Sequence, residues 1–380
     1  MSTAADLNYI PLFNDAIRKL FSNAVRVTLA HPRIAGFFVR MSRSQRRAAR
    51  VRAGWEARGV HVPPFLIISV TGRCNLACAG CYFQAQERVE EEMNGAKLAD
   101  VVRQGRELGI GIMLLAGGEP FTRQEDLLSI ASAEPGVIFP VFTNGLLLTE
   151  TLVTQLKSQS NIIPVVSLEG HEMDTDARRG KGVSRQARAT VERLRAAGVF
   201  FGISLTVTSA NLTTVTDPTF VAELMTLGCR LFFFVEYVPV REGTESLVLT
   251  EEQRCQLATC TDVMHDRHAG LFIAFPGDEQ AYGGCLAAGR GFVHISPSGR
   301  VEPCPFAPYA DTNVRDVSLL EALQSPFLKT IRESHERLGE TQGGCALWAQ
   351  REWVRSLLAT SDAVGGTVQG RPHEDDEHLL

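Results

Sequence analysis

Short apolar runs of strand length alternate with longer stretches of helical periodicity from residue 65 to about residue 270. Helical stretches are expected near 88–108, 122–133, 149–159, 184–197, 218–227 and 250–268. Six strand–helix units in series predict a parallel sheet with right-handed crossovers, and therefore an α/β fold. Ligands of such sheets bind beyond the carboxyl ends of the strands. The expected strands are Phe65–Val70, Gly111–Ala116, Val137–Phe142, Ile162–Leu168, Phe201–Val207 and Leu231–Tyr237.

The segments on either side of this alternation have different patterns. Residues 8–55 have helical periodicity, with a break expected at His31-Pro32 and a second helix from Ile34 to Arg52. Residues 285–306 are rich in Gly and Pro with short strand-like pieces, and helices are expected at Ser318–Ser334 and Ala346–Ala359. The predicted units are a helical N-terminal extension, a strand–helix domain, a small C-terminal domain and an acidic tail, at 1–62, 63–270, 271–360 and 361–380.

Charge is distributed unevenly along a chain of ordinary globular composition. The 380 residues are 44% hydrophobic and 21% charged with a net charge of −5, which excludes collagen and wholesale disorder. The first 60 residues nevertheless hold eleven basic and three acidic side chains. Such a basic end is expected either to cap the acidic body as packed helices or to dock on an anionic partner, a membrane surface or an anionic substrate. Nucleic acid is disfavoured because the remainder is acidic.

We expect no secretory leader, because Met1–Asp6 lacks a basic region and no short apolar core with a small-residue cleavage site follows; no apolar run is long enough to span a membrane. We therefore expect a cytoplasmic protein, with residues 8–55 available for peripheral contact at the inner membrane surface. In a reducing compartment the nine cysteines favour metal ligation or core packing over disulfides.

Three of these cysteines lie in one loop directly after the first expected strand. Cys74, Cys78 and Cys81 fall within eight residues, close enough for three thiolates to face one compact soft-metal centre. A four-iron cluster held by three protein thiolates keeps one iron open. The alternatives are a zinc site that lacks a fourth ligand, although structural zinc sites usually have paired CxxC or CxxC/His sets, and chance clustering of the cysteines.

The CxxxCxxC spacing after the first strand resembles the radical S-adenosylmethionine (radical SAM) superfamily over about residues 65–270. The resemblance implies a partial (β/α)6 TIM-like barrel in which Cys74, Cys78 and Cys81 hold a [4Fe–4S] cluster. Its open iron binds SAM, and one electron, from a donor such as ferredoxin or flavodoxin, cleaves SAM to a 5′-deoxyadenosyl radical. That radical abstracts hydrogen from an unactivated C–H bond. The protein positions the cofactor and keeps solvent away.

Motifs at further strand ends match the same family. A GGEP motif follows the second strand and a TNG motif the third, although both strings also occur as ordinary turns. A Ser-Leu-Glu-Gly strand end resembles the family's SxDG, and either Arg178 or Arg179 is suited to pair with the SAM carboxylate. His171 is more simply a loop residue. The implied cofactor-binding residues are Gly117, Gly118, Glu119, Asn144, Ser167, Glu169, Arg178 and Glu236.

One position departs from the family pattern. An aromatic residue commonly precedes the third cysteine and packs near the adenine, whereas this chain has Gly80. Tyr82 or Phe83 are candidates to replace that contact, and Tyr237 is expected near the adenine or the substrate.

A second set of cysteines lies in Gly- and Pro-rich loops near the C-terminus. Cys285, Cys304 and Cys345 resemble ligands of the auxiliary-cluster domain of radical SAM enzymes, which has a long form, SPASM, and a shorter form, twitch. The resemblance implies a second, auxiliary [4Fe–4S] cluster of the twitch type. Unligated thiols or one zinc are the alternatives. The remaining residues, Cys229, Cys255 and Cys260, are expected to be structural.

These features together predict a radical SAM enzyme of unidentified substrate. The basic N-terminal helices favour an amphiphilic or lipid-linked small molecule. A peptide is the first alternative, because SPASM and twitch domains resemble those of peptide-maturing enzymes. A non-catalytic iron–sulfur redox scaffold is the second alternative.

Overall fold

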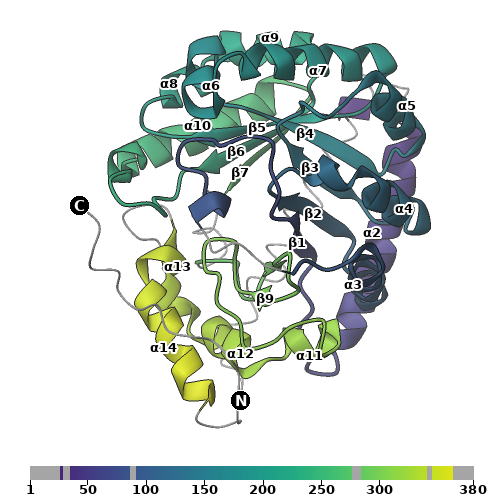
Figure 1. Cartoon of the computed structure of the whole chain (residues 1–380), viewed down its shortest axis with the longest axis vertical. Helices are drawn as coiled ribbons and strands as arrows, with labels where there is room; N and C mark the ends of the chain where they lie inside the picture. The colour runs from purple at the N-terminus through teal and green to yellow at the C-terminus, as the bar shows by residue number, and fades with distance from the viewer. Residues whose placement is uncertain (1–25, 29–34, 86–90, 276–283, 340–344, 363–380) are drawn as a thin grey trace.

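The computed structural model describes residues 26–28, 35–85, 91–275, 284–339 and 345–362, which form one nine-stranded sheet with its helices (Figure 1). Seven of the strands are parallel and lie side by side in chain order. The six expected strands are confirmed to within two residues at their ends, and a seventh continues the sheet. These strands are β1 (Phe65–Thr71), β2 (Ile112–Gly117), β3 (Phe139–Thr143), β4 (Ile162–Leu168), β5 (Gly202–Val207), β6 (Leu231–Glu236) and β7 (Leu271–Phe275).

Helices cover the outer face of these strands, as right-handed crossovers require (Figure 1). The expected helices are confirmed, except that the first begins at Gly95, where the Asn94 side chain accepts from the backbone of Lys97. The short helices α6 and α8 are additions to the prediction. The helices are α3 (Gly95–Leu108), α4 (Gln124–Ala133), α5 (Glu150–Ser158), α6 (Glu172–Arg179), α7 (Val183–Ala197), α8 (Leu212–Val215), α9 (Pro218–Thr226) and α10 (Glu251–Arg267).

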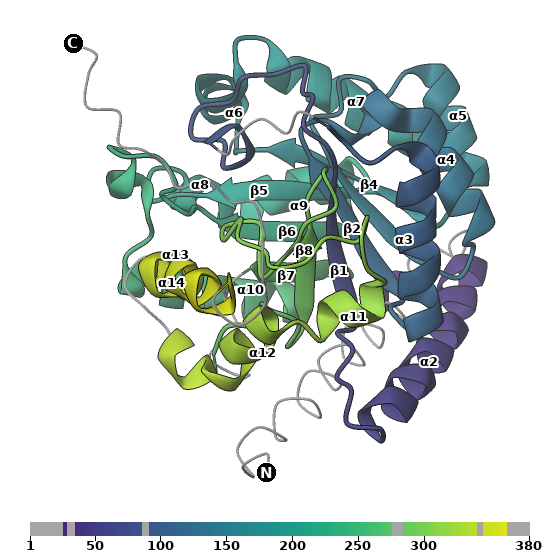
Figure 2. The ribbon, with the colours of Figure 1, turned by 60° about the horizontal axis from the view of Figure 1, so that its bottom comes forward.

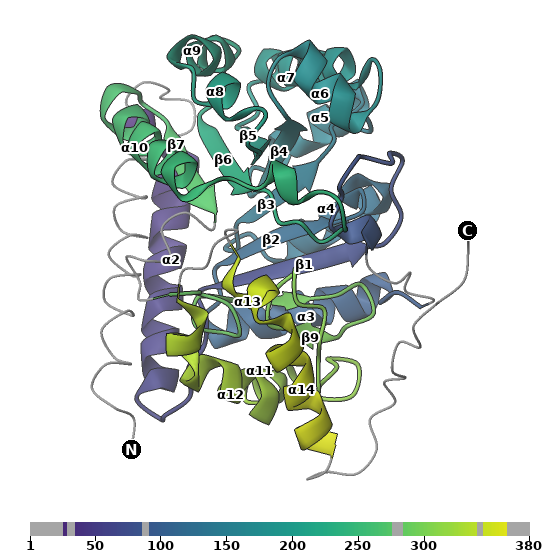
Figure 3. The ribbon, with the colours of Figure 1, turned by 90° about the vertical axis from the view of Figure 1, so that its left-hand side faces the viewer.

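The basic helix α2 (Ala35–Glu56) lies across the end of the sheet at which the strands begin (Figure 3). Its buried residues Phe37 and Met41 pack into a second hydrophobic cluster with strand residues that include Val165 and Phe233. The apolar face of α2 therefore closes the barrel, and its exposed face is arginine-rich. Of the basic segment predicted at 8–55, residues 8–25 and 29–34 lie outside the described ranges. No described helix is long and apolar enough to cross a membrane.

The C-terminal part joins the same sheet on the other side of β1. Strand β8 (Phe292–Ile295) pairs in parallel with β1, placing Phe292 opposite Phe65, and β9 (Val301–Glu302) is antiparallel to β8. Strand β1 is consequently an interior strand, flanked by β2 and β8. The expected boundary near residue 270 thus falls within one continuous sheet, and the division into domains stays a prediction.

Two predicted C-terminal helices are each divided in the structure. Ser325 caps a new helix at Pro326, and proline is favoured at a first helical position. Helix α11 packs beside α3, and α12 packs against α14 (Figure 2). The four helices are α11 (Leu319–Leu323), α12 (Pro326–Glu333), α13 (Ala346–Ala349) and α14 (Arg351–Asp362).

Candidate active site

The loop after β1 that carries Cys74, Cys78 and Cys81 is seated on the GGE segment after β2. The backbone N–H of Gly118 donates to Thr71 O, and that of Glu119 donates to Arg73 O, both at 2.8 Å. A Cβ at Gly118 would lie 2.2 Å from Arg73 O, and one at Gly117, where φ is +114°, would lie 2.5 Å from Thr71 O. Glycine is therefore required here because the cysteine loop passes directly over the backbone.

The side chain of Glu119 joins the ends of two strands, β2 and β3. It is 1% exposed and accepts hydrogen bonds from Phe121 N at 3.1 Å, Thr143 Oγ1 at 2.8 Å and Asn144 N at 2.8 Å. Burial raises the pKa of this carboxyl, while the hydrogen bonds from Asn144, Thr143 and Phe121 oppose the shift. Glu119 thus fixes the end of β3 against the end of β2.

The TNG turn after β3 also contacts the cysteine loop. Asn144 Nδ2 donates to Asn75 Oδ1 at 2.7 Å, and Asn75 follows Cys74 directly. The next residue, Gly145, has a φ of +83°, which glycine adopts without strain. The TNG motif therefore forms a turn and also contacts the cysteine loop.

The end of β4 and helix α6 form a charged cluster beside Cys78. Glu169, which is 2% exposed, pairs through Oε1 with Arg178 at 2.6 Å and with Arg179 at 2.6 Å. The carbonyl of Arg178 accepts a 2.8 Å hydrogen bond from Ala79 N, within the cysteine loop. Burial raises the pKa of the Cys78 thiol, and the guanidinium groups of Arg179 and Arg178 act against that shift. The two arginines favour a negatively charged occupant of the Cys78–Cys81 turn.

The end of β6 reaches the same turn from the other side. Tyr237 follows β6 and lies so close to Gly80 that a Cβ there would be 2.5 Å from Tyr237 Oη. Glu236 is 4% exposed at the end of β6, and Ser167 is 9% exposed near the end of β4. The predicted residues of β2, β3, β4 and β6 therefore lie at the edge of the sheet that carries the cysteine loop.

The donor set of the loop fits an iron–sulfur cluster better than one metal ion. None of the nine cysteines forms a disulfide. Across the described ranges, no three His, Cys, Asp or Glu side chains converge closely enough to hold a single metal ion. In a four-iron cluster each thiolate binds a different iron, so three cysteines spread along a loop suit it. The hydroxyl of Tyr237 and Glu169 Oε2, both buried without a hydrogen-bond partner in the described part, are polar atoms suited to a bound cofactor.

The C-terminal cysteines are buried, with exposures of 6% for Cys285, 5% for Cys304 and 8% for Cys345. The turns that carry the first two are adjacent, because Ala288 N donates to Pro303 O at 3.0 Å. The sequence-based assignment of Cys285, Cys304 and Cys345 to an auxiliary cluster is not tested by this geometry and stays a prediction.

The aromatic residue Tyr82 lies between the two cysteine sets. Burial raises its pKa, and the charges of Cys81 and Cys304 raise it further. Its ring packs edge-on against Phe306, with centroids 5.1 Å apart. Tyr82 thus contacts the C-terminal part, whereas Tyr237 is the residue that fills the space at Gly80.

The other cysteines have separate environments. Cys229 is fully buried, its thiol donates to Leu231 O at 3.2 Å, and burial raises its pKa to about 12. Cys255 and Cys260 lie on α10. Cys255 is exposed and Cys260 is half-buried, and the structural role expected for all three cysteines stays a prediction.

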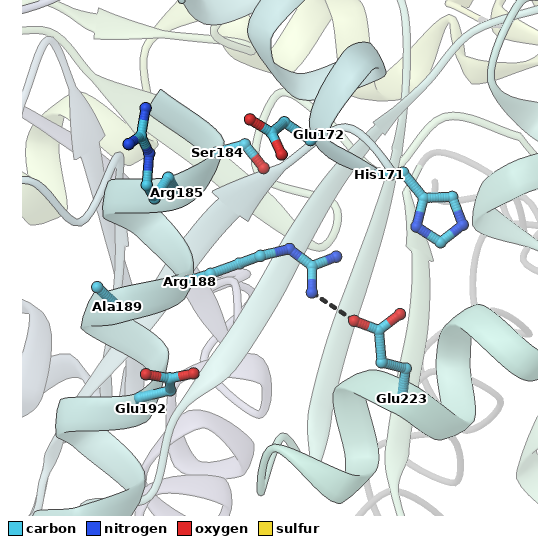
Figure 4. Close-up of a pocket in the computed structure, with 8 residues that line it drawn as sticks. All are labelled: His171, Glu172, Ser184, Arg185, Arg188, Ala189, Glu192 and Glu223. Carbon is cyan, nitrogen blue, oxygen red and sulfur yellow. Dashed lines mark hydrogen bonds and ion pairs between the residues drawn. The ribbon is translucent and has the colours of Figure 1, made fainter. Parts of the chain in front are cut away.

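A separate surface pocket lies in the outer helical layer between α6, α7 and α9 (Figure 4). It is lined by His171, Ser184 and Arg185 among others, and an ion pair between Arg188 and Glu223 crosses it. His171 also packs edge-on against Phe220. This pocket is formed by the outer helices, not by the strand ends, so His171 is a loop residue of the outer layer.

Comparison with known families identifies the strand–helix part. Residues 68–222 match the radical SAM superfamily. These residues form a radical SAM domain. This family uses a [4Fe–4S] cluster and SAM, and the matched residues include the cysteine loop and the GGE, TNG and Ser-Leu-Glu-Gly strand ends.

The radical SAM chain resembles several curated proteins. It is 29% identical over 337 residues to the AdoMet-dependent heme synthase of Methanosarcina barkeri, covering 80% of this chain and 94% of that protein. It is 29% identical to the mycofactocin maturase MftC of Mycobacterium tuberculosis, covering 66% of each chain. It is 27% identical to the PqqA peptide cyclase of Gluconobacter oxydans, covering 74% of this chain and 85% of that protein.

Solved structures confirm the fold of this radical SAM enzyme. Streptococcus suis SuiB bound to S-adenosylmethionine superposes with a TM-score of 0.61 at 21% identity, covering 75% of this chain and 72% of SuiB. The structure of anSMEcpe with bound AdoMet gives a TM-score of 0.57 at 14% identity, covering 79% of this chain and all of that chain.

Several site contacts were not predicted from sequence. Asn75 and Thr143 belong to quoted motifs, but their hydrogen bonds become apparent only when the strand ends are assembled. Arg179 was an alternative to Arg178, and the structure pairs both with Glu169. Tyr237 is expected from sequence near the adenine or the substrate, but its contact with Gly80 is not, since Tyr82 and Phe83 are the replacements expected for an aromatic residue there.

Proposed function

We propose that this radical SAM enzyme abstracts hydrogen from a C–H bond of a substrate bound over the carboxyl ends of β1–β6, with Cys74, Cys78 and Cys81 as cluster ligands. The observation that carries the proposal is the seating of the cysteine loop. It is tied to β2 through Glu119, to β3 through Asn144, and to α6 through Ala79.

When bound, the cluster and SAM supply one-electron cleavage chemistry that leads to hydrogen abstraction. The residues of this chain hold the reactants. Glycines 117 and 118 seat the cysteine loop. Glu119 and Ser167 are proposed to position the cofactor, and the Arg178–Arg179 pair places positive charge beside Cys78.

We further propose Cys285, Cys304 and Cys345 as ligands of an auxiliary cluster. Their burial supports this, as does the contact between the Cys285 and Cys304 turns. A ligand outside these three, from this chain or the substrate, completes a four-iron cluster. An electron donor such as ferredoxin or flavodoxin stays a prediction.

A peptide is the substrate class that we propose first. Two of the curated relatives are named for peptide or precursor maturation, MftC and the PqqA cyclase. The fold neighbour SuiB has also been solved with its precursor peptide SuiA. The twitch-like C-terminal cysteines agree with this class.

A tetrapyrrole is the second candidate, favoured by one observation. The match to the heme synthase spans 94% of that protein, whereas the match to MftC spans 66%. The positive charge that Arg178 and Arg179 place beside Cys78 suits an anionic substrate of this class.

The structure leaves fewer residues of the basic N-terminus available for membrane contact than the sequence suggested. The apolar face of α2 packs on the barrel, so Phe37 and Met41 are not available to insert into lipid. Anionic vesicle flotation of the full chain, with and without residues 1–60, tests residues 8–55. Equal flotation of the two forms would contradict peripheral membrane contact and the lipid-linked substrate.

Anaerobic reconstitution of the full chain tests the central proposal. We expect iron and sulfide to bind, and 5′-deoxyadenosine to form when a strong reductant and SAM are added. Cys78→Ala should abolish 5′-deoxyadenosine formation and lower the amount of iron bound, whereas Cys255→Ala on α10 should leave both unchanged. Iron binding without SAM binding or cleavage would support the redox-scaffold alternative instead.

To test the two substrate classes, the same assay is run with a library of precursor peptides and, separately, with Fe-coproporphyrin III. A change of peptide mass that depends on SAM supports the first class. A loss of porphyrin carboxylate mass supports the second. If neither the peptides nor the porphyrin is modified or increases 5′-deoxyadenosine formation, both substrate classes are contradicted.

A further inference from the structure

Tyr237 lies against the turn that joins Cys78 and Cys81. A Cβ built at Gly80 would be 2.5 Å from Tyr237 Oη and 3.0 Å from Cε2, so position 80 has no room for a side chain. The φ of Gly80, +64°, also favours glycine. The Tyr237 ring therefore occupies the space that a side chain at position 80 would fill, and it brings the end of β6 into contact with the loop after β1.

The backbone holds Tyr237 firmly in this position. Its N–H donates to Val207 O at 2.9 Å, which extends the pairing of β6 with β5 by one residue. The side chain is 3% exposed. Residues 232–234 are all phenylalanine, so packing alone does not explain a tyrosine at the next buried strand end.

The hydroxyl of Tyr237 is buried and has no hydrogen-bond partner in the part of the chain that the structure describes. Buried polar groups in proteins are nearly always paired, because an unpaired hydroxyl lowers the free energy of unfolding. The Tyr237 hydroxyl lies against the Cys78–Cys81 turn. In that turn Ala79 N donates to Arg178 O, and the guanidinium groups of Arg179 and Arg178 act on Cys78. A hydrogen-bond donor in this place suits a negatively charged acceptor.

Resting on the proposed function, we infer that the Tyr237 hydroxyl donates a hydrogen bond to an acceptor of the cofactor assembly at the Cys78–Cys81 turn. The acceptor is either a cluster or thiolate sulfur, or an oxygen or nitrogen atom of SAM. Hydrogen bonds to sulfur stabilise the reduced, more negative form of a cluster and so raise its reduction potential. Tyr237 is thus a positioning residue that replaces, from β6, an aromatic side chain absent at Gly80.

Tyr237→Phe tests the inference because it keeps the ring and removes only the hydroxyl. The full chain is reconstituted anaerobically, and the midpoint potential is measured by redox titration monitored by electron paramagnetic resonance. SAM affinity is measured separately. A sulfur acceptor predicts a lower midpoint potential, and a SAM acceptor predicts a weaker SAM affinity by about two- to tenfold.

Thr261→Val provides the matched control, since it removes a buried hydroxyl from α10 that bonds only within its helix. It should leave both the potential and the SAM affinity unchanged. If Tyr237→Phe also leaves both unchanged in an enzyme that binds the cluster and cleaves SAM, the inference is overturned and the proposed function stands. A wild-type chain that binds neither cofactor would overturn both.

Discussion

Single glycines determine whether the cysteine loop can be seated at all. At Gly118 the atom in the way of a Cβ is Arg73 O, and backbone cannot move aside as a flexible side chain can. The GGE string could be recognised in the sequence, but its glycines could only be guessed to face a ligand. The structure shows that they face the loop.

Gly118→Ala is expected to lower the free energy of unfolding by about 1–3 kcal/mol, as overpacking does, and to reduce cluster content. Chemical denaturation and iron analysis measure the two effects. Gly54→Ala in α2 is the matched control, because a Cβ there meets nothing within 4 Å. It should stabilise the helix by about 0.5–1 kcal/mol. Similar behaviour of the two variants would contradict the proposed seat.

The buried carboxylate of Glu169 balances two guanidinium groups beside Cys78. Removing it in Glu169→Ala leaves those cations without their partner, and we expect a loss of about 3–5 kcal/mol in the free energy of unfolding. Asp100→Ala is the control, since its pairs with Lys97 and Arg103 are more exposed and are worth about 0–1 kcal/mol. Equal losses in urea titrations would show that burial of the Glu169 cluster does not matter.

At the scale of elements, strand and helix alternation predicted β1–β6 and their main helices correctly because each buried run is long and uninterrupted. Strand β8 lies among the short strand-like pieces expected in residues 285–306, but its bounds were not predicted, since its second half holds a polar residue, His294, that finds its partners only in the folded sheet. Helix α6 escaped because its eight residues are mostly charged, with Thr175 as its buried residue. Helix α6 is held in place by the ion pairs of its last residues with Glu169, by the hydrogen bond from Ala79 N to Arg178 O and by its N-terminal cap. None of these contacts produces a hydrophobic period in the sequence.

The junction of α6 and α7 gives a pH-dependent prediction. Asp176 accepts from Gly182 N and Ser184 N, and these hydrogen bonds hold the pKa of its carboxyl below the ordinary value of 3.8. The stability that Asp176 contributes is complete above pH 3.8 and is lost as pH falls through the lowered native pKa.

Asp176→Ala should therefore unfold more readily than wild type at pH 7, and the difference should shrink in strong acid. Urea titrations at several pH values measure it. Asp262→Ala on the exposed side of α10 is the control. A difference between wild type and Asp176→Ala that stays constant down to the acid limit would contradict the capping role.

At the scale of the whole molecule, a buried polar chain joins the two cysteine regions through the sheet. His294 on β8 contacts Ser69 Oγ on β1 at 2.8 Å and Glu302 Oε2 on β9 at 2.8 Å, and all three are at most 2% exposed. Glu302 lies two residues before Cys304. These hydrogen bonds among Ser69, His294 and Glu302 therefore set the position of the Cys304 turn relative to β1.

His294→Leu is expected to leave Ser69 without its hydrogen-bond partner and Glu302 with only its 3.6 Å ion pair to Arg300. We expect this to cost about 1–3 kcal/mol for each buried group. It should also lower iron bound by the C-terminal cysteines. A background in which Cys74, Cys78 and Cys81 are replaced by alanine isolates that iron for analysis. Unchanged iron content there would show that the Cys304 turn is positioned independently of β1.

The pairing of β1 with β8 has a consequence for how the protein is made. During synthesis β1 emerges early, but its neighbour β8 is translated only after most of the chain, since Phe65 pairs with Phe292. Until then one edge of the strand that leads to the cysteine loop stays open to pairing with other chains. Completion of the sheet, and with it a stable seat for the iron–sulfur cluster, is therefore expected to be a late step for the nascent chain.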